Sequence, residues 1–220
     1  MAISSESLAN IQYFSGLSPY ELNSIKGYFS EKTIKKKQIF LIEGDWSDYV
    51  YFVVSGLVKV YKTSTSSKEQ ILYIAGAGES LNDVSTLCDT PNVASMLAMQ
   101  PTILYCTRRD DLKFILAKYS LVAINASRVM AEKVQQSSSV IADLSFRQVI
   151  GRLANVLLKG ERTSSKLNLT QEDLAALVGT TREVITRSLK ILVEKGMVKH
   201  TRGCIEIVDK KALLELLTKS

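Results

Sequence analysis

Two arginines and a glutamate lie at helical spacing near the C-terminus, as Arg182, Glu183 and Arg187. A guanidinium group can donate two parallel hydrogen bonds to O6 and N7 of guanine, and a carboxylate can accept one from the amino group of cytosine. On a 3.6-residue period the three side chains share one arc of a helix. The opposite arc is apolar and holds Ile185, Leu189 and Leu192. This pattern predicts a helix with one buried face and one face able to read base edges.

A second predicted helix positions the first. Thr170 followed three residues later by Asp173 marks a capped helix start, and apolar residues continue at helical spacing up to position 178. Gly179 breaks the pattern, and Thr180 with Glu183 repeats the start signal. Two short helices joined by a glycine-containing turn form a helix-turn-helix, whose second helix enters the major groove of DNA. An ordinary capped helical hairpin is the alternative.

Two predicted strands follow Gly196, at residues 197–200 and 204–208, and add a β-wing to the helices. The spacing therefore indicates a winged helix, with base contacts from Arg182, Glu183 and Arg187. For Glu183, capping the helix and contacting a base fit equally well. We expect polar residues around the base-reading face to contact DNA phosphates or the flanks of the site: Thr170, Gln171, Thr181, Thr186, Lys190, His200 and Arg202.

The formal net charge of +6 is unevenly distributed along the 220 residues. Residues 1–145 hold 14 Lys and Arg and 14 Asp and Glu, whereas residues 146–220 hold 14 and 8. The whole basic excess therefore lies in the predicted nucleic-acid-binding segment, as neutralisation of phosphates requires. A small basic domain can also simply be soluble, so the charge supports the motif and does not stand alone.

Several classes of protein are not expected. Cys88, Cys106 and Cys204 are far apart and lack metal-ligand or disulfide spacing, which favours a reducing compartment and predicts no metal site. No apolar run reaches the roughly 18 residues that span a bilayer, so we expect a cytoplasmic protein without a membrane partner. A single histidine and the lack of a catalytic spacing argue against an enzyme.

The N-terminal half predicts an antiparallel jelly roll preceded by short helices. Residues 7–14 and 18–28 have helical patterns, and Ser18, Pro19 and Glu21 form a helix start. The lysines at 35–37 are expected on a solvated edge. Short β-rich runs separated by turns then follow, at residues 39–42, 49–54, 57–61, 71–74, 94–99 and 103–107.

A long helical pattern over residues 120–144 connects the halves. Its apolar and small residues alternate in steps of four and three, as in a coiled coil: Ala123, Ser127, Met130, Val134, Ser137, Ile141 and Leu144. This seam predicts a partner helix, with packing inside the chain as the alternative. The next helix is expected over residues 146–158, before a polar loop at 159–166 and after a hinge at 143–146. Its expected buried stripe consists of Phe146, Val149, Ile150, Leu153, Ala154 and Leu157.

Two stretches resemble the CRP/FNR family of bacterial transcription regulators. One is the helix-turn-helix run over residues 170–190, and the other is the E-G-D-x-x-D-x-V-Y-F-V-x-S-G-x-V-K-V pattern over residues 43–60. The resemblance implies an α+β protein with a cyclic-nucleotide-binding-type β-roll at 1–118, a dimerisation helix at 119–145 and a winged helix-turn-helix at 146–220. It also implies a homodimer that binds double-stranded operator DNA and contacts RNA polymerase in response to an effector.

The expected effector segment departs from the nucleotide-binding members. Their Arg-Ser pair corresponds to Val93 and Ala94 here, and no Lys or Arg lies between Gly78 and Cys106. A cyclic phosphate would lack a charged partner within this segment, so cyclic AMP is disfavoured. Met96 and Leu97 add to a largely apolar expected lining. The predicted effector-pocket residues, two of them placed by the resemblance alone, are Leu81, Asn82, Asp83, Val84, Leu87, Cys88, Val93, Ala94, Ser137 and Ser138.

The effector and cofactor remain open in the sequence. Residues 89–92 are similar to the nitric-oxide-responsive, haem-associated branch of the family. A haem would take Cys88, a Met or a Tyr as its axial ligand, because the only histidine lies in the predicted wing. Another small effector, a thiol-redox sensor and an unliganded core are the alternatives. An iron–sulfur cluster is disfavoured because three scattered thiols do not supply four ligands.

Overall fold

The computed structural model describes residues 3–162, 169–201 and 204–218. The chain forms two compact units. The first unit comprises residues 1–62 and 72–134, and the second comprises residues 63–71 and 135–220. Helix α5 (Ser120–Phe146) continues from the first unit into the second.

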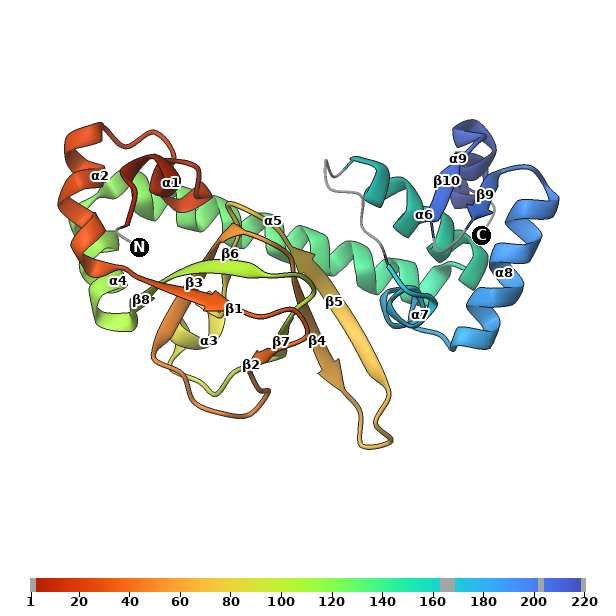
Figure 1. Ribbon diagram of the computed structural model, residues 1–220, viewed down its shortest axis with the longest axis horizontal. Coiled ribbons are helices and arrows are strands. Elements are labelled where there is room, and N and C mark those ends of the chain that lie inside the picture. The colour runs from red at the N-terminus through yellow and green to blue at the C-terminus, as the bar shows by residue number, and fades with distance from the viewer. Residues whose placement is uncertain (1–2, 163–168, 202–203, 219–220) are drawn as a thin grey trace. The chain divides into compact units, whose positions relative to one another are not determined.

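Two four-stranded sheets form the β-roll that the sequence predicts (Figure 1). The first sheet has the order β1 (Ser30–Ile34), β8 (Thr102–Arg108), β3 (Tyr49–Ser55) and β6 (Ser80–Leu81). The second has the order β2 (Ile39–Leu41), β7 (Ser95–Ala98), β4 (Val58–Thr63) and β5 (Glu69–Ala75). Strand β8 pairs antiparallel with both β1 and β3. Strands β1 and β6 were not predicted, because four of the five residues of β1 are polar and β6 has only two residues.

Helices α1 (Ser5–Ala9), α2 (Pro19–Ile25) and α4 (Arg109–Lys118) lie at one end of the β-roll (Figure 1). The other short helices of this unit are η1 (Gln12–Phe14), η2 (Lys26–Tyr28) and α3 (Asp83–Cys88). The predicted start of α2 is confirmed, because Ser18 and Glu21 form a reciprocal capping box. The single helix predicted over residues 7–14 is wrong. The chain turns after α1, and the N–H of Gln12 donates to the carbonyl oxygen of Gly78 instead of continuing the helix.

An aromatic core joins the N-terminal helices to the first sheet. Phe14 and Phe52 lie 5.2 Å apart in an edge-to-face arrangement, and Phe29 packs edge-to-face on both. Val122 and Val129 of α5 belong to the same buried cluster. The N-terminal half of α5 is therefore fixed to the first unit by hydrophobic burial.

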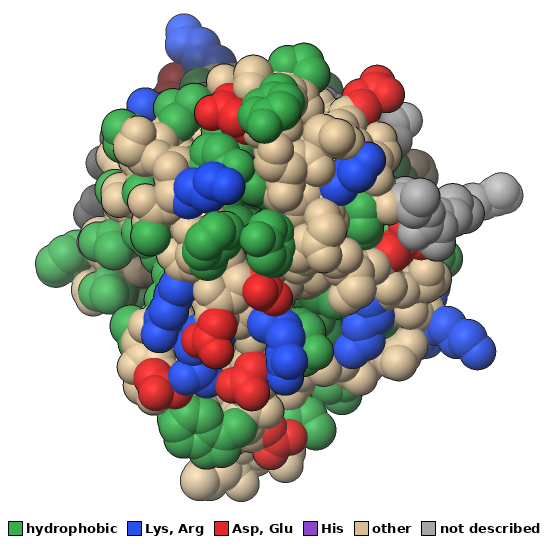
Figure 2. Space-filling view, turned by 90° about the vertical axis from the view of Figure 1, so that its left-hand side faces the viewer, with side chains coloured by type: hydrophobic (Ala, Val, Ile, Leu, Met, Phe, Trp, Pro, Cys, Tyr) green, Lys and Arg blue, Asp and Glu red, His purple; other side chains and the backbone are tan. Residues whose placement is uncertain are grey.

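Charged side chains are mixed on the N-terminal end of the molecule, where acidic and basic groups alternate among exposed hydrophobic ones (Figure 2). This agrees with the zero balance of residues 1–145. The lysines at 35–37 are exposed in the turn between β1 and β2, as expected. Within the described residues, no single helix has the length and hydropathy of a membrane span; α4 and α5 have them only as a pair, bent by 115° at their junction.

The exposed apolar face of α5 differs from the predicted seam. Met130 packs against the aromatic core and Ala123 is half-buried, so these two predicted seam positions face the chain's own core. The exposed residues that alternate in steps of three and four are Ile124, Ser127, Ala131, Val134, Ser138 and Ile141. Two of the seven predicted seam residues, Ala123 and Met130, are therefore wrong, because the chain's own core covers them. The other five are exposed: Ser127, Val134, Ser137, Ile141 and Leu144.

The second unit contains α6 (Val149–Arg162), α7 (Gln171–Val178), α8 (Arg182–Glu194), β9 (Val198–Thr201), β10 (Cys204–Ile207) and α9 (Lys210–Thr218). Leu153 and Ala154 are buried as predicted, and α9 adds Leu213 to the same core. Two expectations are wrong. The predicted loop at 159–166 is helical as far as Arg162, and its remainder lies outside the described residues. Phe146 ends α5 with 76% of its surface exposed instead of joining the buried stripe.

Candidate nucleic-acid interface and effector segment

The turn of the helix-turn-helix is defined by backbone geometry. Thr170 and Asp173 form the predicted capping box at the start of α7. Gly179 ends that helix with φ +74°, in the left-handed region that side chains other than glycine rarely adopt. The N–H of Thr180 then donates to the carbonyl oxygen of Ala175 at 3.0 Å. Thr180 therefore belongs to the end of α7, and the prediction that it starts the next helix is wrong.

Helix α8 begins after Thr181, whose side chain accepts no capping hydrogen bond. Its inner face is buried as predicted: Ile185, Leu189 and Leu192. The side chains of Arg182, Glu183 and Arg187 are exposed on the other face. Because the inner face fixes the rotation of the helix, the position of the outer face follows from the packing of three aliphatic side chains.

Two contacts link the exposed face of α8 to the first turn of α7. The hydroxyl of Thr186 donates to Oε1 of Gln171 at 2.9 Å, which brings two predicted phosphate-contacting residues together. Arg182 Nη1 lies 2.9 Å from Glu172 Oε1. Glu172 was not predicted as a site residue, although it is adjacent to Gln171 in the sequence. The ion pair holds the Arg182 side chain on the outer surface without burying it.

The carboxylate of Glu183 interacts with the start of its own helix. Hydrogen bonds from its own backbone N–H and from the Thr181 side chain lower the pKa of Glu183, with smaller contributions from the charges of Arg182 and Arg187. The group is therefore ionised at neutral pH and can accept hydrogen bonds. Lys190 lies 3.8 Å from Glu194 one turn along the helix, and both are exposed.

The predicted wing is present as the antiparallel pair of β9 and β10, in which His200 lies opposite Ile205. The side chain of His200 is exposed. Arg202, the other predicted wing residue, lies outside the described residues. The exposed predicted phosphate or flank residues are Thr170, Thr181, Thr186, Lys190 and His200, and Gln171 is half-buried.

The residues predicted for the effector pocket are spread between the interior and the surface. Four are buried in the first unit: Leu81, Asn82, Asp83 and Ala94. Leu87 is half-buried, whereas three others are exposed: Val84, Cys88 and Val93. Ser137 and Ser138 are exposed residues of α5 that belong to the second unit. Met96 is buried between the sheets, and Leu97 is half-buried.

A positive charge reaches the effector segment from a distant part of the chain. Nζ of Lys133, on α5, lies 2.7 Å from Oδ2 of the buried Asp83 and 3.0 Å from the carbonyl oxygen of Ser80. Lys133 was not predicted as a site residue, because it lies far outside the segment between Gly78 and Cys106. Burial alone would raise the pKa of Asp83, but the charge of Lys133 and the hydrogen bonds to the carboxylate outweigh burial and lower it.

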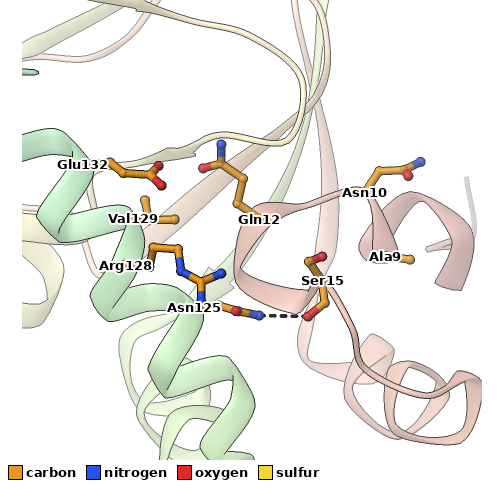
Figure 3. Close-up of a pocket in the computed structure, with 8 residues that line it drawn as sticks. All are labelled: Ala9, Asn10, Gln12, Ser15, Asn125, Arg128, Val129 and Glu132. Carbon is orange, nitrogen blue, oxygen red and sulfur yellow. Dashed lines mark hydrogen bonds between the residues drawn. The ribbon is translucent and has the colours of Figure 1, made fainter.

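A cavity of about 440 Å³ lies in the first unit between η1 and α5 (Figure 3). Its wall includes Asn125, whose Nδ2 donates to the carbonyl oxygens of Tyr13 and Ser15. The charged groups that line it are Arg128 and Glu132. No residue predicted for the effector pocket lines this cavity. Within the described ranges, no cluster of three or more His, Cys, Asp or Glu residues could hold a metal ion.

Comparisons with known proteins agree with both parts of the chain. The cyclic nucleotide-binding domain family matches residues 31–119, and the Crp-like helix-turn-helix domain family matches residues 151–216. The "Cyclic AMP receptor protein" of Thermus thermophilus is 31% identical over 204 residues, covering 92% of this chain and 94% of the relative.

Solved structures show the same architecture. A CRP/FNR-family protein from Eubacterium rectale is 26% identical with a TM-score of 0.74, covering 94% of this chain and 99% of the other. FixK2 from Bradyrhizobium japonicum, at 22% identity, has a TM-score of 0.76 and covers 86% of this chain and 96% of the other. With a β-roll, a long connecting helix and a winged helix-turn-helix in this order, the chain belongs to the CRP/FNR family of DNA-binding transcription regulators.

Proposed function

We propose that the protein acts as a homodimer that recognises a near-palindromic operator through α8 of each subunit. The observation that carries this proposal is the two-sided character of α8. Its inner face is buried through Ile185, Leu189 and Leu192, so the face with the arginines stays available to a DNA groove. In this role Arg182 and Arg187 read guanine, and Glu183 accepts from cytosine.

The phosphate contacts come from residues that surround this face. Hydroxyl and amide groups at a helix start are typical donors to DNA phosphates. We assign this role to Thr170, Gln171, Thr181, Thr186, Lys190 and His200, and to Arg202 outside the described residues. Glu172 carries a negative charge beside them and weakens non-specific attraction to phosphates while it orients Arg182.

Dimerisation is assigned to the exposed face of α5. Val134 is 67% exposed and Ile141 is 64% exposed, although both are aliphatic and share one side of a long helix. Small residues between them, such as Ala131 and Ser138, allow a second helix to approach closely. A second copy of α5 would bury this face. RNA polymerase is the further partner proposed for the DNA-bound dimer. The dimer is therefore proposed to act in the cytoplasm.

Cyclic-nucleotide dependence is not part of the proposal, although the Thermus relative is named for cyclic AMP. Val93 and Ala94 occupy the positions where nucleotide-binding members have Arg and Ser. Two cations from outside this segment reach it: Arg109, which pairs with Asp89, and Lys133, which is paired with Asp83. A cyclic phosphate would have to compete with that carboxylate for the same ammonium group. An effector of another chemistry, or regulation without one, fits these residues better.

Operator selection tests the assignment of α8. Duplexes selected by the wild-type protein from a random library would be titrated with Arg182→Ala and with Lys211→Ala, an exposed cation on α9 as a matched control. We expect Arg182→Ala to lose about 1–3 kcal/mol of binding free energy and to relax preference at one base pair in each half-site. The control should keep the wild-type preference. Unchanged base preference in Arg182→Ala would reject the assignment.

A further inference from the structure

The carboxylate of Asp83 is surrounded by hydrogen-bond donors inside the first unit. Oδ2 accepts from the hydroxyls of Ser80 at 2.6 Å and Tyr13 at 3.1 Å, and from Nζ of Lys133 at 2.7 Å. Oδ1 accepts from the same ammonium group and from the N–H of Val84, each at 3.0 Å. Only 2% of the Asp83 surface is exposed, so water contributes little to this solvation.

The donors come from parts of the chain that are distant in sequence. Tyr13 lies in η1, 70 residues from Asp83, and Lys133 lies on α5, 50 residues from it. The ring of Tyr73 on β5 lies 6.0 Å from the Lys133 ammonium group. Burial and the charge of Asp83 raise the pKa of Tyr13, which keeps its hydroxyl protonated as a donor. One ionised carboxylate therefore holds together η1, the corner between β6 and α3, and α5.

This arrangement has the chemistry of an anion-binding site. An ammonium group, two hydroxyls and a backbone N–H converge on two oxygen atoms, as they would on a bound carboxylate or phosphate. We propose that Lys133, Ser80 and Tyr13 form an anion site whose occupant is the chain's own Asp83 carboxylate, so that α5 is held on the first unit without an anionic effector. For its effect on DNA binding, this inference rests on the proposed function.

The location of the site gives the internal carboxylate a regulatory consequence. Asp83 lies in the segment predicted to receive an effector, and Lys133 is next to the residue at which α5 leaves the first unit. A tethered carboxylate has a far higher effective concentration than a free anion in solution. A small anion therefore does not displace it under ordinary conditions, and operator binding requires no added anion.

Removal of the carboxylate should convert the internal site into one for a free anion. In Asp83→Ala, the space and donors left behind match formate, which supplies the missing carboxylate without a tether. Thermal unfolding would be followed in sodium formate and in sodium chloride at equal ionic strength. We expect formate to raise the Tm of Asp83→Ala in a saturable manner. For wild type and for Asp83→Asn, the Tm measured in formate should equal the Tm measured in chloride. An equal response of all three proteins would overturn the site.

Operator binding provides the second readout. Wild-type protein that has been unfolded, dialysed and refolded should bind its selected duplex at full affinity, and added phosphate or cyclic AMP should not change that affinity. In chloride, Asp83→Ala should bind the duplex up to about tenfold more weakly than wild type, a change in the range typical of allosteric coupling. In formate its affinity should recover. Wild-type affinity for Asp83→Ala in chloride would disprove the link to DNA binding.

The outcomes separate the two proposals. If the wild type selects no operator but formate stabilises Asp83→Ala, the proposed function fails and the anion site stands. If Asp83→Ala does not fold in either salt, operator binding by the refolded wild-type protein tests the anion site instead. A requirement for an added anion before that protein binds DNA would overturn the inference, and full affinity without one would support it.

Discussion

The pair of Lys133 and Asp83 should make the first unit sensitive to a change in one side chain. Removal of one partner from a buried ion pair leaves an uncompensated charge, which costs more than the pair itself contributes. We expect Lys133→Met to lower the free energy of unfolding by about 3–5 kcal/mol in urea denaturation. The exposed pair of Lys62 and Glu43 supplies the control, because Lys62→Met should change stability by less than about 1 kcal/mol.

The double variant Lys133→Met with Asp83→Asn separates charge from packing. If the uncompensated carboxylate causes the loss, removal of its charge should restore part of the stability. A double variant that is less stable than Lys133→Met alone would indicate that side-chain packing, and not charge, dominates at this position.

Acid should weaken the contribution of Asp83. Because its pKa in the folded protein is lowered, its stabilising effect is fully present above the ordinary aspartate value of about 3.9 and is lost as pH falls through the folded value. The difference in unfolding free energy between wild type and Asp83→Asn should therefore be constant near neutral pH and shrink below about pH 4. Burial raises the pKa of Glu79, which acts in the opposite direction and is present in both proteins.

A difference that stays the same from neutral pH to about pH 3 would contradict the lowered pKa of Asp83.

The ion pair between Asp83 and Lys133 could not be predicted from the sequence. Nothing in local spacing connects residue 83 to residue 133, because the contact depends on how α5 packs on the β-roll. By contrast, the exposure of Arg182, Glu183 and Arg187 followed from helical period alone, because three aliphatic residues determine which face is buried.

At the scale of elements, helix ends were predictable where a side chain forms the cap. Ser18 with Glu21 and Thr170 with Asp173 gave the starts of α2 and α7 correctly. The start of α8 was misplaced by one residue, because the N–H of Thr180 is used by the end of the preceding helix. In α5, Ala123 and Met130 were wrongly predicted to face a partner helix, since periodicity does not say which of two adjacent faces the rest of the chain covers.

Gly179 should be the least replaceable residue of the turn. A Cβ at this position would lie 2.8 Å from Cδ2 of Leu144 and would occupy a backbone conformation with φ +74°. We expect Gly179→Ala to destabilise the protein by about 1–2 kcal/mol from the backbone alone. At Gly160, inside α6, a Cβ would meet no atom of the described residues within 4 Å, so Gly160→Ala should stabilise by about 0.5–1 kcal/mol.

Circular dichroism during thermal unfolding would measure both glycine variants. Equal effects of the two substitutions would show that neither the left-handed conformation nor the contact with Leu144 matters for stability. A loss confined to Gly179→Ala, accompanied by weaker operator binding, would show that the angle between α7 and α8 depends on this turn.

The distribution of charge and the proposed two-fold symmetry together predict how the protein binds DNA. The basic excess lies in residues 146–220, whereas the N-terminal end presents mixed charge (Figure 2). Non-specific attraction to phosphates should therefore come from the second unit. The order of the elements was predictable because each has its own periodicity. The proposed dimerisation surface was not, because it depends on which face of α5 the first unit leaves open.

Two copies of α8 related by a two-fold axis should read half-sites about one helical turn apart, roughly 34 Å. Insertion of about five base pairs between the half-sites would place them on opposite sides of the duplex, so a rigid dimer could engage only one. We expect wild-type affinity for the altered operator to fall roughly hundredfold or more, as measured by fluorescence anisotropy, because the second binding event is lost.

The α5 variant Val134→Glu gives the matched control for this spacing effect. Opposed glutamates on the exposed face of α5 would repel each other and separate the subunits, which analytical ultracentrifugation would detect. A monomer binds one half-site at a time, so this variant should bind the natural and altered operators with the same low affinity. Spacing can matter only to a molecule that touches both half-sites. A Val134→Glu protein that stays dimeric in the ultracentrifuge and still distinguishes the two operators would therefore refute the assignment of dimerisation to this face.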